Sequence, residues 1–142
     1  MRWAEWITES QPQIRFEELG EERPFTSAEL QARAKANPWK NGRKQYRVWL
    51  GEFEVAYLSF DVFWDDQVNL YEIFVAAEFR NGGVGARCIR FAIDLAKELQ
   101  KPRLTVRPGY IGGQSKDRLR KWYIERGFNP VKGDAEFLEI IV

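Results

Sequence analysis

The fold of this chain is decided by the stretch Val75-Ala76-Ala77-Glu78-Phe79-Arg80-Asn81-Gly82-Gly83-Val84-Gly85-Ala86. It follows an apolar, strand-like run, Leu70 to Val75, and leads into a helical pattern over about residues 83–100. A strand that turns on glycines into a helix leaves several backbone N–H groups unpaired, beside the positive end of the helix dipole. This arrangement favours the binding of an anion, and of phosphate above all.

The glycines do not fit the two best-known phosphate-binding motifs. No Lys-Ser or Lys-Thr follows them, which excludes a Walker loop, and Cys88 occupies the third glycine position of a dinucleotide fingerprint. The pattern that fits is Arg-x-x-Gly-x-Gly, formed by Arg80, Gly83 and Gly85 and followed by the small Ala86. A glycine turn that only introduces a structural helix would produce the same short pattern.

Two further segments support the binding interpretation. One is a late helical segment, Leu119-Arg120-Lys121-Trp122-Tyr123-Ile124-Glu125-Arg126-Gly127-Phe128. The other is a predicted hairpin of residues 45–50 and 53–60, joined by Gly51-Glu52, a two-residue hairpin signal.

Together these segments resemble the GNAT acetyltransferases, in which a loop of the Arg-x-x-Gly-x-Gly type holds the pyrophosphate of acetyl-coenzyme A. The resemblance covers about residues 45–142 and lies in the order hairpin, strand, glycine loop, helix, strand, helix, strand, strand. It implies an α/β fold with a mixed, mostly antiparallel central sheet, a splayed parallel strand pair and flanking helices. We expect residues 1–142 to form one such domain.

The resemblance also implies a cofactor site. The cofactor would lie in the split between the parallel strands 68–75 and 103–107, with its pantetheine arm paired to the backbone near Phe74 and Val75. The amides of residues 81–86 would hold the pyrophosphate. The predicted cofactor-binding residues are Phe74, Val75, Arg80, Asn81, Gly82, Gly83, Val84, Gly85 and Ala86.

Tyr123 matches the family's general acid, which protonates the leaving thiolate when an amine attacks the thioester. Leu119, Trp122 and Tyr123 share one helical face, so the alternative is that all three are core residues; the Gly127-Phe128 pair that follows favours the acid.

An amine with a lysine-like pKa of about 10.4 is mostly protonated at neutral pH, so a base must accept its proton. We predict Glu72 for this role, directly or through water; the alternatives are an exposed strand residue or a partner for a nearby arginine. Asp65 and Asp66, in the turn before that strand, could attract a cationic acceptor or simply be solvated.

The composition narrows the chemistry. The chain has no histidine, which excludes a Ser-His-Asp triad, a Cys-His pair and a histidine-built zinc site. Its single cysteine, Cys88, excludes an internal disulfide and favours a reducing compartment. Because no apolar run approaches the ~18–20 residues of a membrane span and no signal peptide is recognisable, we expect a cytoplasmic protein without a membrane partner.

The net charge of +1 conceals an asymmetry. Residues 1–78 carry 9 Lys and Arg against 14 Asp and Glu, whereas residues 79–142 carry 13 against 7. Positive potential in the second half would favour a polyanionic cofactor, although basic helix surfaces are common. The near-zero total and the absence of a recognised motif argue against a nucleic-acid partner.

The predicted function is acetyl-CoA-dependent N-acetylation of a primary amine by direct attack in a ternary complex, without a metal. The alternative is a catalytically weak or inactive GNAT-fold interaction protein. Trp3, Trp6, Trp39 and Trp64 lie outside the matching motifs and would allow a protein-binding surface or a homodimer contact. A modifier of charged tRNA or of a ribosomal protein is a third, weaker possibility.

Two features depart from the family pattern. Lys116 stands where the family commonly has asparagine, and the loop 108–114 is longer than usual. This altered loop could shape a particular acceptor site or weaken the site, and Arg107, Tyr110 and Gln114 are the first residues to mutate if catalysis is shown.

Local signals complete the prediction. Thr26 is predicted as the N-cap of an early helix, with Glu29 completing a capping box and Phe25 packing on Leu30. The other expected elements are a strand at 12–19, a helix end near 37–38, a turn at 64–67, a helix from Ser115 and strands at 128–131 and 135–142.

Overall fold

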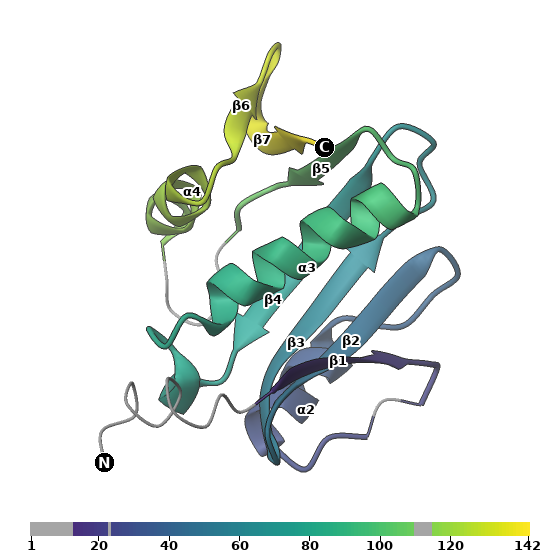
Figure 1. The fold of residues 1–142 in the computed structure, drawn as a ribbon, viewed down its shortest axis with the longest axis vertical. Coiled ribbons are helices and arrows are strands. Elements are labelled where there is room, and N and C mark those ends of the chain that lie inside the picture. The colour runs from purple at the N-terminus through teal and green to yellow at the C-terminus, as the bar shows by residue number, and fades with distance from the viewer. Residues whose placement is uncertain (1–12, 23, 110–114) are drawn as a thin grey trace.

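The computed structural model describes residues 13–22, 24–109 and 115–142. They form a seven-stranded sheet in the order β1-β2-β3-β4-β5-β7-β6, flanked by helices (Figure 1). In chain order the elements are β1 (Ile14–Leu19), α2 (Ala28–Ala36), β2 (Arg43–Leu50), β3 (Phe53–Asp61), β4 (Val68–Val75), the 3-10 turn η1 (Ala77–Phe79), α3 (Val84–Glu98), β5 (Arg103–Val106), α4 (Lys116–Glu125), β6 (Asn129–Val131) and β7 (Asp134–Ile141).

The sheet is antiparallel except where β4 and β5 run parallel. These two strands pair only from Val68 to Leu70 on β4, against Leu104 to Val106 on β5. Because β4 continues for five more residues to Val75, the pair opens at its carboxyl end. The predicted mixed sheet with a splayed parallel pair is therefore confirmed.

Helices α3 and α2 cover opposite faces of the sheet, with α3 in front and α2 behind in Figure 1. Alternation along β3 and β4 explains this arrangement, because successive side chains point to opposite faces. Leu58 and Phe60 belong to the α3 core, whereas Tyr57 and Phe74 pack with Leu30 of α2.

The start of α2 differs from the prediction. The N-cap is Ser27, whose Oγ accepts from the Leu30 amide at 3.3 Å, and not Thr26. Glu54 of β3 accepts hydrogen bonds from the Thr26 amide and hydroxyl and from the Ser27 amide, at 2.7–3.1 Å. Thr26 therefore donates to a buried carboxylate of another element and does not cap the helix. Spacing along the sequence cannot reveal such a partner.

Glu29 also has a tertiary partner, because it accepts from the backbone amide of Ala77 at 3.1 Å. Burial alone would raise the pKa of Glu54, but hydrogen bonds from Thr26, Ser27 and Arg47 lower it below its ordinary value. These contacts attach α2 to the sheet beside the open end of β4.

Most other local predictions are confirmed. The Gly51-Glu52 turn joins β2 to β3, and Ser115 caps α4 by accepting from the Arg118 amide at 3.1 Å. Within the described ranges, no helix combines the length and the apolarity that crossing a membrane requires.

Candidate active site

The glycine loop connects β4 to α3 through backbone conformations that suit small or polar residues. After η1, Asn81 has φ 65° and Gly83, at the N-cap, has φ 85°. Both lie in the left-handed region, which asparagine visits and which glycine adopts without steric cost. Space around the Gly83 Cα is open, so its glycine is required by the turn rather than by a neighbour.

The amides of this loop remain available for a ligand. Among the described residues, no turn or cap hydrogen bond uses the N–H groups of residues 81–86, and no side chain caps α3. The first-turn amides of a helix have no intrahelical acceptor. The loop therefore presents unpaired donors at the positive end of a 15-residue helix, as the sequence predicted.

Position 85 requires glycine because a side chain of another helix lies close to its Cα. A Cβ built there would lie 2.7 Å from Cζ2 of Trp122 on α4. The guanidinium of Arg126 stacks on the same indole, 3.9 Å from the ring centre. The glycine thus lets α4 approach the first turn of α3.

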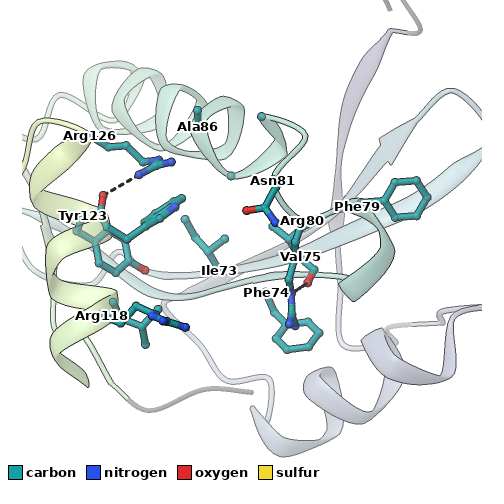
Figure 2. A pocket seen from close by; sticks show the side chains of 14 residues that line it. Ile73, Phe74, Val75, Phe79, Arg80, Asn81, Ala86, Arg118, Tyr123 and Arg126 are labelled. Atoms are coloured by element: carbon teal, nitrogen blue, oxygen red, sulfur yellow. Dashed lines mark hydrogen bonds between the residues drawn. The ribbon is translucent and has the colours of Figure 1, made fainter. Parts of the chain in front are cut away.

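A first cleft, with a volume of about 480 Å³, extends from the glycine loop between β4 and α4 (Figure 2). All the predicted cofactor residues line it except Gly82 and Val84. Val84 buries its side chain in the core, so it can offer only its amide. The cleft is lined by Ile73, Phe74, Val75, Phe79, Arg80, Asn81, Gly83, Gly85, Ala86, Arg118, Leu119, Trp122, Tyr123 and Arg126.

Arg80 lines this cleft and forms a hydrogen bond within the protein. Its Nε donates to the carbonyl of Val75 at 2.9 Å, and its guanidinium lies 5.2 Å from the ring centre of Phe74 (Figure 2). The Val75 carbonyl is part of the backbone to which the family resemblance assigns the pantetheine arm.

Tyr123 is buried on α4, and its hydroxyl points into the first cleft in Figure 2. Its ring is held edge-on by Trp122 and Phe128, at 5.1 and 5.3 Å. Burial raises the pKa of the Tyr123 hydroxyl, and the charge of Glu72 raises it further. The phenol therefore stays protonated at neutral pH and can donate its proton.

Glu72 lies on the other side of β4. Arg33 of α2 holds its carboxylate, with Nη2 and Nε at 2.6 and 2.7 Å from Oε2. The sequence had left such an arginine partner open. Burial raises the pKa of Glu72 above its ordinary value, although Arg33 acts in the opposite direction.

Glu72 lines a second cleft, which has a volume of about 570 Å³. Its lining comes from α2, β4, β7, the turn before β4, the ends of β3 and β5, and the start of α4: Arg33, Asp61, Trp64, Asn69, Leu70, Tyr71, Glu72, Arg107, Pro108, Gly109, Lys116 and Phe137. Sequence reasoning singled out Glu72, Arg107, Lys116 and Trp64. It missed Arg33, Asp61 and Tyr71, because helix and strand patterns do not show which side chains meet across elements.

The remaining candidates fall into two groups. Asp66 pairs with Arg103 at 3.1 Å, and Cys88 is a buried core residue, with a pKa that burial raises to about 12. Trp3, Trp6, Tyr110 and Gln114 lie outside the described residues. Among the described residues, no group of three or more Asp, Glu or Cys side chains is placed so that it could hold a metal ion.

Comparison with known proteins gives a consistent result. A family model, described as the acetyltransferase (GNAT) family, matches residues 3–128. A GNAT family acetyltransferase from Elizabethkingia anophelis, solved with acetyl-CoA bound, superposes with a TM-score of 0.63 at 16% identity, over 91% of this chain and 98% of that one. A Bacillus subtilis acetyltransferase in complex with CoA gives 0.64 at 16% identity, over 92% and 99%.

The structural likeness extends to a toxin. A mutant of the toxin AtaT, bound to the C-terminus of the antitoxin AtaR, gives a TM-score of 0.63 at 13% identity, over 91% of this chain and 92% of that one. No curated protein matches the sequence. At such low identities the likeness to solved structures establishes the fold.

Proposed function

Since the chain belongs to the GNAT acetyltransferase family, we propose that it transfers an acetyl group from acetyl-CoA to a primary amine by direct attack in a ternary complex. One observation carries the proposal: the glycine loop, whose amides are unpaired, lines the first cleft through Asn81, Gly83, Gly85 and Ala86, and Tyr123 lines the same cleft. An anion site and a proton donor thus share one cavity.

The cofactor would bind through backbone groups. The amides of residues 81–86 hold the pyrophosphate, and Arg118 and Arg126, which line the same cleft, add positive charge. The pantetheine arm lies along β4 beyond Leu70, where β5 no longer pairs with it. When the arm pairs with the backbone near Val75, the hydrogen bond from Arg80 to the Val75 carbonyl breaks, and the Arg80 guanidinium can then contact phosphate.

The chemistry requires two proton transfers. The amine nitrogen attacks the thioester carbonyl carbon, a C–N bond forms, and the C–S bond breaks as the tetrahedral intermediate collapses. Glu72 or a water molecule takes the proton that the amine loses, and Tyr123 gives its proton to the departing sulfur. Backbone N–H groups near Val75 polarise the thioester carbonyl.

The first test is binding followed by transfer. Isothermal titration calorimetry should detect acetyl-CoA and CoA, and a thiol-release assay with a panel of amines should show amine-dependent formation of CoA. Absence of any binding would contradict the proposal at its basis. Binding of CoA without transfer to any amine would instead favour the interaction-protein alternative.

Glu72 supplies a prediction about pH. A base must be deprotonated, so kcat/KM should fall as the pH decreases through the raised pKa of Glu72, in addition to the fall caused by protonation of the amine. Glu72→Gln should lower kcat/KM by about 10²-fold or more at neutral pH and leave only the amine's own pH dependence. The measurement is a pH–rate profile of both proteins.

Arg33→Gln is the matched variant. It removes the charge that lowers the pKa of Glu72, so the acidic limb of the profile should move to higher pH. If both variants lose thermal stability but keep the wild-type profile shape, Glu72 and Arg33 form a structural ion pair and Glu72 is not the base.

A further inference from the structure

The second cleft contains both acidic and basic residues, but the acids are shielded. The side chains of Asp61 and Glu72 are only 6% and 3% exposed. Arg43 holds Asp61 through two hydrogen bonds, at 2.7 and 3.1 Å, and Arg33 holds Glu72. Each carboxylate is therefore neutralised by a guanidinium before any ligand arrives.

The basic residues of the cleft are accessible. Arg107 is 58% exposed, and its only described ion pair is a 3.3 Å contact to Glu136, itself 53% exposed. Such a pair contributes little in water. Lys116 is exposed at the first position of α4 and has no ion pair among the described residues. A ligand entering this cleft therefore meets accessible positive charge.

The same cleft has apolar walls. Trp64 and Tyr71 are large, exposed side chains that line it. The cavity has the size of a small-molecule site. It is lined by Asn69 to Glu72 of β4 and the first cleft by Ile73 to Val75, so the two cavities lie along consecutive segments of one strand.

From these observations we infer that the acceptor is a small amine that also carries a carboxylate, of the amino-acid class. Arg107 and Lys116 bind the carboxylate, the amino group lies at the Glu72 end, and Trp64 and Tyr71 contact an apolar side chain. This inference rests on the proposed acetyl transfer and specifies its substrate.

The experiment uses matched acceptors, phenylalanine with 2-phenylethylamine and leucine with isoamylamine, which differ in the carboxylate. Because the carboxylate also lowers the pKa of the neighbouring amino group, kcat/KM is calculated for the free-amine form of each acceptor. We expect kcat/KM to favour the amino acid by at least about tenfold in each pair, because charge-assisted hydrogen bonds to a carboxylate are among the stronger ones. Arg107→Ala and Lys116→Ala should each raise KM for the amino acids about tenfold and leave KM for the plain amines unchanged. Lys132→Ala, in the exposed β6–β7 turn, is the charge-matched control.

A second variant should act in the opposite direction. Glu136→Gln releases Arg107 from its competing carboxylate, so it should lower KM for the amino acids by up to about threefold. Equal kcat/KM within each acceptor pair, or transfer confined to charged tRNA or to protein lysines, would overturn the inference while acetyl transfer stands. Failure to bind acetyl-CoA would instead remove the proposed function, and the two outcomes are read from separate assays.

Discussion

Replacement of Gly83 by valine should weaken acetyl-CoA binding by at least about 100-fold, measured by isothermal titration calorimetry. Gly83 has φ 85°, which a β-branched residue adopts only with strain. The backbone would relax toward negative φ and turn the first amides of α3 away from the pyrophosphate. Loss of two charge-assisted hydrogen bonds is enough to account for a change of this size.

The chain offers a close control for this experiment. Gly133, in the turn between β6 and β7, has φ 86° and open space around its Cα, as Gly83 does. Gly133→Val therefore imposes similar backbone strain outside the first cleft. It should lower the melting temperature about as much as Gly83→Val and leave the Kd for acetyl-CoA within about twofold. Equal loss of binding in both variants would show that the effect is general destabilisation.

Tyr123→Phe should lower kcat by about 100-fold and leave the Kd for acetyl-CoA nearly unchanged. The substitution keeps the ring that packs edge-on against Trp122 and Phe128 and removes only the hydroxyl that points into the first cleft. Without a proton donor, the thiolate must leave unprotonated, so the loss appears in turnover. Steady-state kinetics, with calorimetry for the cofactor, separates the two quantities.

Tyr46 provides the comparison for Tyr123. It is also a buried tyrosine, burial raises its pKa to about 12, and its ring packs edge-on against Phe60 and Phe91 in the α3 core. Tyr46→Phe should leave kcat unchanged. If Tyr123→Phe also keeps wild-type kcat, Tyr123 is a core residue, as its helical spacing had allowed.

Much of the site could be predicted because its determinants are local. The glycine loop follows from glycines between a strand pattern and a helix pattern. Tyr123 is assigned because its helix, followed by Gly127 and Phe128, resembles the late helix of the GNAT family. That residues 1–142 form one domain, and that Tyr123 and Glu72 act as acid and base, remain predictions.

The incorrect N-cap shows where this approach fails. Thr26 satisfied every local criterion for a capping box, but Glu54, 28 residues away, provides a carboxylate that accepts from its amide and hydroxyl. Ser27 then becomes the cap. A competing tertiary hydrogen bond therefore overrode a correct local propensity.

The sequence by itself determined the elements, their order and the glycine loop, because turns, caps and hydrophobic periodicity depend on neighbours a few residues apart. Only the tertiary structure decided how those elements meet: Trp122 against Gly85, Arg33 on Glu72 39 residues away, and the separation of Tyr123 and Glu72 into two clefts. Such contacts depend on how helices pack on a sheet that opens after Leu70, and spacing along the chain carries no record of that packing.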